Sequence, residues 1–352
     1  MSNGCHFIST GFLNGDIMFR KVTLFILLIA LVGCSQDERE TATANPAVNA
    51  DMHNGSTGRL FVTNEEDNTV SVIDTATLTV EATIPVGERP RGIGLSPDGS
   101  VVYVALGEED AIGVIDTHSL EVIDNIPAGS DPEAFAVHPQ GNIYLSNEDD
   151  NLASVLDPSS REIIAEIPVG IEPEGVGVTP DGSRVMVTSE STNMVHVIAV
   201  PEHEVIANIL VGARPREVTF TADGQWGFVT SEVAGEVAKL DVANNTILTT
   251  VKLSQIDGVK PKGILLSRDE RVLYVSTGRG NAIAVLNAET LALENTIPVG
   301  TRVWGIALSR DGSRLYAANG VSGTVSVVDT VSQEEIATVE VGELPWGVAL
   351  DD

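Results

Sequence analysis

The sequence contains little cysteine, few aromatic side chains and few positive charges. Its 352 residues include two cysteines, 4% aromatic residues, and 20 Lys and Arg against 50 Asp and Glu. The two cysteines, Cys5 and Cys34, are too few for a disulfide scaffold or a four-cysteine metal site. A formal charge of −30 excludes a general nucleic-acid-binding protein, because that affinity requires Lys and Arg to neutralise phosphates. It also argues against peripheral binding to anionic lipid head groups.

The rest of the composition is typical of a folded protein. Hydrophobic residues make up 43% of the chain, with 33 Gly and 16 Pro, so this is not a disordered acidic tail. The length is compatible with two domains or with one large β-barrel or propeller.

A short apolar run near the N-terminus predicts a secretory leader. Arg20 and Lys21 precede Val22–Val32, whose 11 residues are too few to span a bilayer as a helix but suit a signal peptide. The run ends in Leu31-Val32-Gly33-Cys34, which resembles the lipobox of bacterial lipoproteins, where the cysteine is lipidated and becomes N-terminal. We therefore expect a lipid on Cys34. The alternative is an ordinary signal peptide that leaves a free thiol.

This resemblance divides the chain into three parts. Residues 1–33 are predicted to be an upstream extension, with Met18 as the initiator, followed by the signal peptide. Residues 34–57 have no apolar periodicity and are predicted to form a flexible tether behind the lipidated cysteine. Residues 58–352 form the folded domain. Because Ser35 rather than Asp follows the cysteine, we expect release to the outer membrane, with a periplasmic domain that meets the membrane only through its lipid.

One unit is repeated seven times in the folded domain. A column of large side chains recurs with steps of 42, 41, 42, 42, 46 and 42 residues: Phe61, Tyr103, Tyr144, Met186, Phe228, Tyr274 and Tyr316. A second column keeps the same steps: Asp74, Asp116, Asp157, Ala199, Asp241, Asn287 and Asp329. Two columns that agree throughout indicate a repeat architecture.

Each unit contains four short runs with the alternation of β-strands, and no run has a helical period of comparable length. Turn signals such as Pro97-Asp98-Gly99 separate these runs. Four strands in about 42 residues predict an all-β, seven-bladed β-propeller with four-stranded blades. The chain enters at a second strand, Arg59, and ends on an inner strand, Trp346–Leu350. We therefore expect the last strand to complete the first blade.

The inner strands share a column of small residues that would let neighbouring backbones approach closely. Its members are Gly92, Ala134, Gly175, Gly263, Gly305 and Gly347. Glu217 breaks the column, so we expect it either to point into the channel or to pair with a nearby Arg.

The repeat columns resemble the YVTN family of β-propeller repeats over about residues 58–352. Some segments are more similar to one subgroup, the propellers associated with pyrroloquinoline-quinone (PQQ)-dependent alcohol catabolism: Gly87–Ile93, Asn147–Asn151, Ser189–His196, Val299–Trp304, Ala318–Ser322 and Leu344–Val348. This resemblance implies an exported protein that acts beside quinoprotein dehydrogenases, cytochromes and a transport system. It carries over no catalytic residues, and we expect no cofactor.

Acidic tripeptides follow the second strand in three successive blades. Nine residues form this group: Glu65, Glu66, Asp67, Glu108, Glu109, Asp110, Glu148, Asp149 and Asp150. One interpretation is a docking surface for a basic partner such as a c-type cytochrome, because complementary charge raises the rate of encounter. The alternative is a set of solvated hairpin tips.

The loops after the fourth strand lead into a second candidate site, at one mouth of the channel. Its ring contains charged and aromatic residues: Arg91, Glu133, Glu174, Arg216, Lys262, Trp304 and Trp346, with Glu217 beside them. Arg and Lys with two Trp suggest a stacking or carboxylate-binding site. The alternative is that the Trp residues pack between blades and the Arg and Glu residues only neutralise one another.

No catalytic template fits the sequence. No His has a partner at metal-ligand spacing, and no nucleophile motif occurs, so we expect neither a metal site nor an enzyme. The sequence predicts a lipid-anchored, non-catalytic propeller that supports PQQ-dependent alcohol oxidation in the periplasm. Its partner would be a c-type cytochrome, a quinoprotein dehydrogenase, a transport component or a small organic ligand. The alternative is a propeller hydrolase of the lactonase type, with Glu133 and Glu174 as bases or metal ligands.

Overall fold

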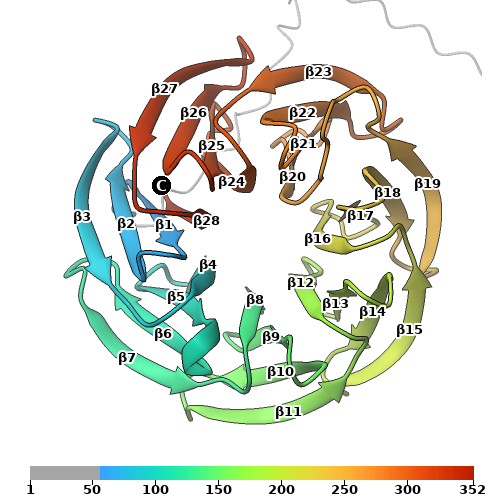
Figure 1. Ribbon diagram of the computed structural model, residues 1–352. Helices are drawn as coiled ribbons and strands as arrows, with labels where there is room; N and C mark the ends of the chain where they lie inside the picture. Colours follow the sequence, from blue (N-terminus) through green and yellow to red (C-terminus); the bar gives the residue numbers. More distant parts are fainter. Residues whose placement is uncertain (1–55) are drawn as a thin grey trace, which may run out of the picture. The chain divides into compact units, whose positions relative to one another are not determined.

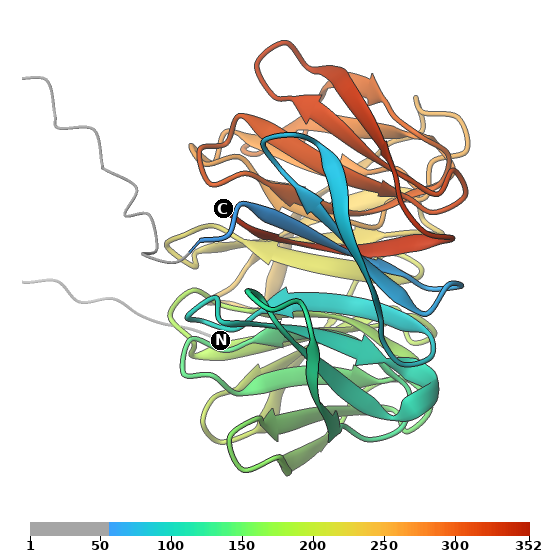
Figure 2. The ribbon, with the colours of Figure 1, turned by 90° about the vertical axis from the view of Figure 1, so that its left-hand side faces the viewer.

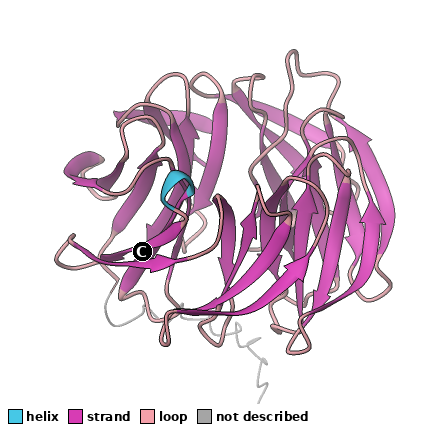
Figure 3. Cartoon of the chain, turned by 60° about the horizontal axis from the view of Figure 1, so that its bottom comes forward, coloured by secondary structure: helices cyan, strands magenta, loops and turns pink. Residues whose placement is uncertain are grey.

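A computed structural model describes residues 56–352 of the chain. The leader, Cys34 and most of the tether lie outside the described residues, so the lipid anchor and the three-part division stay predictions. Residues 56–352 form strands and one 3-10 helix, Gly107–Glu109 (Figure 3). Among these residues, no helix is long and apolar enough to cross a membrane.

The strands form seven antiparallel four-stranded sheets arranged as the blades of a propeller (Figure 1). From the inner to the outer strand, blade 1 is β28 (Pro345–Asp351), β1 (Arg59–Asn64), β2 (Thr69–Asp74) and β3 (Thr79–Pro85). Blade 2 is β4 (Pro90–Leu95), β5 (Val101–Leu106), β6 (Ala111–Asp116) and β7 (Val122–Pro127). Blade 3 is β8 (Pro132–Val137), β9 (Ile143–Asn147), β10 (Leu152–Asp157) and β11 (Glu162–Pro168).

The remaining four blades follow the same order. Blade 4 is β12 (Pro173–Val178), β13 (Arg184–Ser189), β14 (Met194–Ala199) and β15 (Glu204–Leu210). Blade 5 is β16 (Pro215–Phe220), β17 (Trp226–Ser231), β18 (Glu236–Asp241) and β19 (Thr246–Lys252). Blade 6 is β20 (Ile264–Leu266), β21 (Val272–Ser276), β22 (Ala282–Asn287) and β23 (Leu293–Pro298). Blade 7 is β24 (Val303–Leu308), β25 (Arg314–Asn319), β26 (Thr324–Asp329) and β27 (Glu334–Glu340).

The predicted fold class is therefore confirmed, including the closure of the ring. The last strand, β28, pairs with β1 in an antiparallel ladder that joins Leu60 to Leu350 and Val62 to Val348. Figure 2 shows these two strands side by side, although they come from opposite ends of the repeat region. The pairing removes the free edge that each strand would otherwise present.

The core lies between the blades. One cluster combines Phe61 and Val70 of blade 1 with Val102 and Leu106 of blade 2, and the other clusters span neighbouring blades in the same way. Because a neighbouring blade covers each face, the middle strands are buried almost continuously rather than at alternate positions. Outer strands such as β11 keep the alternation of a half-exposed strand.

The small-residue column permits the predicted close approach of inner strands. A Cβ at Gly263 would lie 2.6 Å from the carbonyl oxygen of Trp304 in the next blade. At Gly347 it would lie 2.6 Å from the carbonyl oxygen of Arg91. Both are shorter than any ordinary van der Waals contact, so a larger residue at these positions would push adjacent blades apart.

Candidate functional site

The candidate site is a cavity of about 380 Å³ at one end of the channel, which we call the mouth. Its wall comes from the loops after the second and fourth strands of the blades. The charged and aromatic residues that line it are Glu65, Arg89, Arg91, Glu148, Glu174, Glu190, Arg214, Arg216, Glu232, Lys260, Lys262, Arg279, Arg302, Trp304 and Trp346.

Except for Arg279, which follows Gly278 directly, these residues come from three columns of the repeat. The innermost column is the predicted ring from Arg91 to Trp346. The second column lies at the end of each loop after a fourth strand, before the next inner strand: Arg89, Asp131, Glu172, Arg214, Lys260, Arg302 and Leu344. The third column follows each second strand: Glu65, Gly107, Glu148, Glu190, Glu232, Gly278 and Gly320. Sequence reasoning missed most of the second and third columns, although the repeat spacing that revealed the first column also aligns them.

Backbone geometry aims the second column at the mouth. Arg89, Asp131, Glu172, Arg214, Arg302 and Leu344 all have φ between 45° and 60°. This left-handed conformation is uncommon for residues with a side chain and is typical of tight turns. Here it turns the chain from the outer strand of one blade into the inner strand of the next.

Hydroxyl groups hold the backbone of the innermost column. Each donates a hydrogen bond to the carbonyl of a mouth residue in the next blade: Thr63 to Arg91 at 2.8 Å, Ser146 to Glu174 at 2.6 Å, Thr188 to Arg216 at 2.9 Å, Thr230 to Lys262 at 2.6 Å and Ser276 to Trp304 at 2.6 Å. Hydrogen bonds to buried carbonyls fix the positions from which the mouth side chains project.

On one side of the mouth, arginine and acidic residues neutralise one another. Arg91 lies 2.9 Å from Glu65 and also contacts Glu133. Arg89 lies 2.5 Å from the second oxygen of Glu133 and also contacts Asp131. Glu133 is fully buried, and this pair of guanidinium groups balances its charge.

A second group of ion pairs lies in blades 4 and 5. Arg216 is 2.6 Å from Glu174 and also contacts Glu190. Arg214 lies 2.5 Å from Glu190 and 3.4 Å from Glu232. Together, the two groups confirm that the Arg and Glu residues of blades 1 to 5 mainly neutralise each other.

The opposite side of the mouth has cations without carboxylate partners. Among residues 56–352, no carboxylate lies within 4.0 Å of Lys260, Arg279 or Arg302. Lys262 is 3.8 Å from Glu174, and its Nζ lies 3.3 Å from the ring centroid of Trp346. We call Lys260, Lys262, Arg279 and Arg302 the cationic arc. The guanidinium of Arg302 lies 4.7 Å from the ring centroid of Trp304, so both indoles face this arc.

The mouth therefore has a charge balance opposite to that of the chain. Eight basic and five acidic side chains line it, while the whole sequence has 20 basic and 50 acidic residues. Burial and the adjacent Glu133 raise the pKa of Glu148 to about 8, so Glu148 is mostly protonated at neutral pH. Burial raises the pKa of Glu133 as well, but Arg91 and Arg89 more than offset this and hold it below its usual value.

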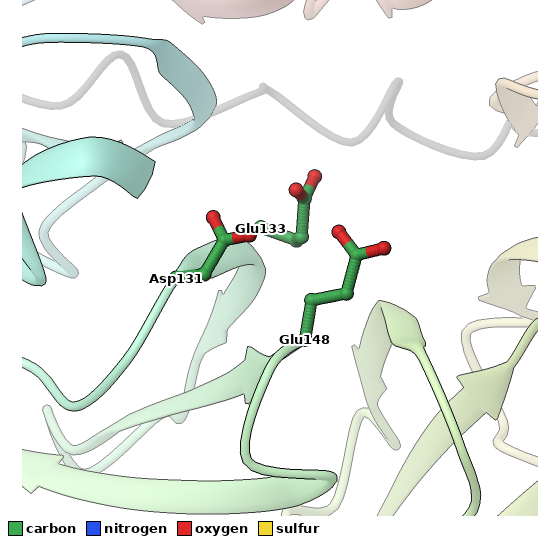
Figure 4. A group of neighbouring side chains, drawn as sticks. All are labelled: Asp131, Glu133 and Glu148. Atoms are coloured by element: carbon green, nitrogen blue, oxygen red, sulfur yellow. The ribbon is translucent and has the colours of Figure 1, made fainter.

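The carboxyl groups of Asp131, Glu133 and Glu148 lie within 4.8 Å of one another, an arrangement that could hold a metal ion (Figure 4). The guanidinium of Arg89 contacts Asp131 and Glu133 and lies 3.8 Å from Glu148. Arg89 thus supplies at this cluster the positive charge that a metal ion would supply.

Six of the predicted ligand-binding residues line the mouth: Arg91, Glu174, Arg216, Lys262, Trp304 and Trp346. Glu133 is buried behind the lining and contacts the two arginines. Glu217 lines a smaller cavity beneath the mouth, and no described cation lies within 4.0 Å of its carboxylate. Of the two expectations for Glu217, the structure bears out the first, a side chain that faces the channel.

Of the nine predicted docking residues, seven are exposed and two, Glu65 and Glu148, are half-buried. Glu65 and Glu148 line the mouth. Asp67, Glu109 and Asp110 accept hydrogen bonds from loop N–H groups of Glu343, Glu88 and Asp131, at 2.7, 3.1 and 3.0 Å. Like these three, Glu66, Glu108, Asp149 and Asp150 are exposed. The alignment of the loops placed these residues on one face but could not show that two of them turn inward.

Two family models match parts of the chain. The model of the seven-bladed β-propeller lactonases matches residues 175–336, and that of the YNCE-like β-propellers matches residues 21–144. Both agree with a propeller of the YVTN type, and neither names the PQQ-associated subgroup. A comparison with curated proteins gives no match.

Solved structures share the fold. Hydrazine synthase of Kuenenia stuttgartiensis is 22% identical with a TM-score of 0.71, over 78% of this chain and 92% of that chain. A protein of unknown function from Desulfotomaculum acetoxidans is 19% identical with a TM-score of 0.74, over 84% and 99%. A proposed 6-phosphogluconolactonase from Bacteroides uniformis is 19% identical with a TM-score of 0.70, over 82% and 98%. At these identities the likeness concerns the fold alone.

Proposed function

We propose that this propeller is a binding protein whose mouth takes a small organic anion with a flat or apolar body, such as an aromatic carboxylate. The observation that carries the proposal is the cationic arc beside Trp304 and Trp346, in a chain that is otherwise strongly acidic. Within the arc, Lys260, Arg279 and Arg302 have no described carboxylate within 4.0 Å and are available to a ligand carboxylate or phosphate. The partly exposed indole of Trp304 offers apolar surface for the remainder of the ligand, whereas Trp346 is buried and Lys262 covers its ring.

The rest of the mouth supports binding by staying rigid. Paired Arg and Glu side chains and the hydroxyl-to-carbonyl hydrogen bonds hold the wall in one arrangement before a ligand arrives. A preorganised site loses less conformational entropy on binding, which favours affinity. The acidic surface around the mouth repels anions, so the arc is the place where an anion meets a favourable potential.

Titration calorimetry with benzoate at low salt tests this proposal. We expect Arg302→Ala and Lys260→Ala each to weaken benzoate binding about tenfold, the loss of one charge-assisted contact. Uncharged benzamide should bind wild type weakly and respond little to either substitution. Arg271→Ala removes the same charge from an exposed turn on the opposite face, so it controls for net charge. Benzoate binding that is absent, or equal in all four proteins, would contradict an anion site at the arc.

A second candidate function is hydrolysis of a lactone, favoured by the match of residues 175–336 to the lactonase model. Glu133 is buried and doubly paired, whereas Glu174 lines the mouth next to Lys262. If this function holds, wild type should hydrolyse glucono-δ-lactone above the buffer rate in a pH-stat assay. Glu174→Gln should then lower turnover about 100-fold, as expected for loss of a general base. Glu166→Gln, on an exposed outer strand, should leave turnover unchanged, and no turnover by wild type would exclude this candidate.

We also propose that the mature protein is exported and anchored through Cys34, as the apolar run and the lipobox resemblance indicate. A role beside PQQ-dependent dehydrogenases rests on the repeat segments alone, and none of the families or structures named above is PQQ-associated. The exposed acids Glu66, Glu108, Asp149 and Asp150 are the residues that a basic partner would meet first.

A further inference from the structure

We propose that a chamber beneath the mouth is a second subsite, and that Glu217 selects there for anions carrying a hydroxyl at the far end of a short chain. The inference rests on the proposed anion site, because the chamber receives the end of a ligand whose charge is held by the cationic arc.

The chamber is a cavity of about 110 Å³ inside the ring of inner strands. Four side chains line both the chamber and the mouth: Glu174, Arg216, Lys262 and Trp346. The two cavities therefore lie on either side of these side chains, and a ligand bound in the mouth reaches the chamber by passing between them. Since a water molecule in the liquid occupies about 30 Å³, the chamber has room for a few heavy atoms.

Most of the residues that line the chamber are apolar or glycine. Its wall is formed by Ile93, Phe135, Val176, Ile306 and Val348, together with glycines of the small-residue column. Such a wall suits the methylene groups of a chain. Apart from the four side chains shared with the mouth, Glu217 is the only charged residue among the described residues that line the chamber.

Glu217 occupies a position that is Gly or Ala in the other six blades. Those small residues are needed where the next inner strand approaches closely. Beside Glu217, the next inner strand is β20, with only three residues, Ile264–Leu266. The backbone N–H of Ile264, at the start of β20, favours the ionised form of the Glu217 carboxyl group and lowers its pKa, against the effect of burial. A carboxylate has about four acceptor positions, so Glu217 keeps capacity for a ligand donor.

The surroundings favour a hydroxyl over an ammonium as that donor. Arg216 and Lys262 form part of the chamber roof, and the guanidinium of Arg216 would repel a second cation. Burial and the neighbouring Arg216 lower the pKa of Lys262 to about 8, so Lys262 is charged in only part of the molecules at pH 8. A hydroxyl donates to the carboxylate without bringing charge into the chamber. Burial raises the pKa of Glu217 to about 7, although Lys262 acts in the opposite direction. Glu217 is therefore mostly an ionised acceptor at pH 8.

Calorimetry at pH 8 with two homologous series tests the subsite. The first series is the ω-hydroxy acids from 4-hydroxybutanoate to 8-hydroxyoctanoate, and the second is the alkanoates from butanoate to octanoate. We expect one chain length at which the hydroxy acid binds wild type about tenfold more tightly than the alkanoate, as a hydrogen bond to a charged group predicts. Glu217→Ala should reduce this ratio to about one, because the variant has no acceptor for the hydroxyl.

Glu217→Ala restores the residue type found in other blades, so we expect it to fold with a melting temperature close to that of wild type. If it does not fold, Glu217→Gln is used for the same measurement. We expect this variant to lower the ratio of hydroxy-acid to alkanoate affinity about threefold, because an uncharged acceptor makes a weaker hydrogen bond. The subsite alone is overturned by either of two results. One is a ratio of hydroxy-acid to alkanoate affinity that no Glu217 variant changes, and the other is equal affinity for hydroxy acid and alkanoate at every chain length. Failure of wild type to bind either series overturns the subsite and the anion site together. Binding of both series that is about tenfold weaker in Arg302→Ala, with the ratio between them unchanged, supports both.

Discussion

A chain that ends at Leu344 is expected to lose the cooperative unfolding transition of the complete ring. The deletion removes β28, which is the inner strand of blade 1, and exposes the ladder edge of β1. It also uncovers one side of the cluster that contains Leu60 and Val62, where Val348 and Leu350 pack. Loss of burial for Trp346, Val348 and Leu350 amounts to about 5 kcal/mol. That is comparable with the whole stability of a typical domain, about 5–15 kcal/mol.

Thermal unfolding followed by circular dichroism measures this effect. The matched control is the truncated chain mixed with a synthetic peptide of residues 343–352, which should restore the transition, whereas a scrambled peptide should not. Restoration in trans would show that the pairing of β28 with β1 is responsible, rather than chain length. A truncated chain that melts at the wild-type temperature would contradict the closure mechanism.

Arg216→Met is expected to lower the free energy of unfolding by about 3 kcal/mol, because it removes a buried counter-ion from two acids. Arg216 lies 2.6 Å from Glu174 and also contacts Glu190, and both carboxylates are nearly inaccessible to solvent. Glu190 keeps Arg214 as a partner. Glu174 keeps only Lys262, 3.8 Å away, and therefore bears most of the penalty.

Urea denaturation of this variant, compared with Arg214→Ala, provides the measurement. The Arg214 side chain is 47% exposed, so its loss should change the unfolding free energy by less than about 1 kcal/mol. Equal effects of the two substitutions would indicate that the ion pairs of the mouth are solvent-screened rather than buried. The denaturant dependence should be unchanged in both variants, because neither alters the surface that unfolding exposes.

Much of the fold could be predicted from the sequence because the repeat is nearly regular. Turn residues and β-alternation recur every 41 to 46 positions. Four strands in so few residues leave little choice of architecture. The repeat region begins with a second strand, at Arg59, and ends with an inner strand, which was sufficient to predict that the last strand closes the ring. The same column logic found six of the residues that line the mouth.

The pairing within the mouth could not be predicted in this way. A column shows that residues share a depth in the ring, but it does not show which side chains meet across blades. Arg89 and Arg214 lie outside the first column, yet they hold Glu133 and Glu190. The nine acids looked equivalent in sequence, but Glu65 and Glu148 turn inward to arginines while the other seven are exposed. Side-chain direction depends on the closed ring, which local periodicity does not encode.

The sequence by itself determined the number of blades, the strand order, the closure and the acidic character of the chain. These follow from periodicity, turn chemistry and composition, which are local or additive properties. Only the tertiary structure decided the charge of the mouth. Closure gathers eight basic side chains from separate blades around one cavity, pairs part of them with acids, and leaves Lys260, Arg279 and Arg302 unpaired. A local surplus of positive charge in an acidic protein thus arises from which side chains meet in space.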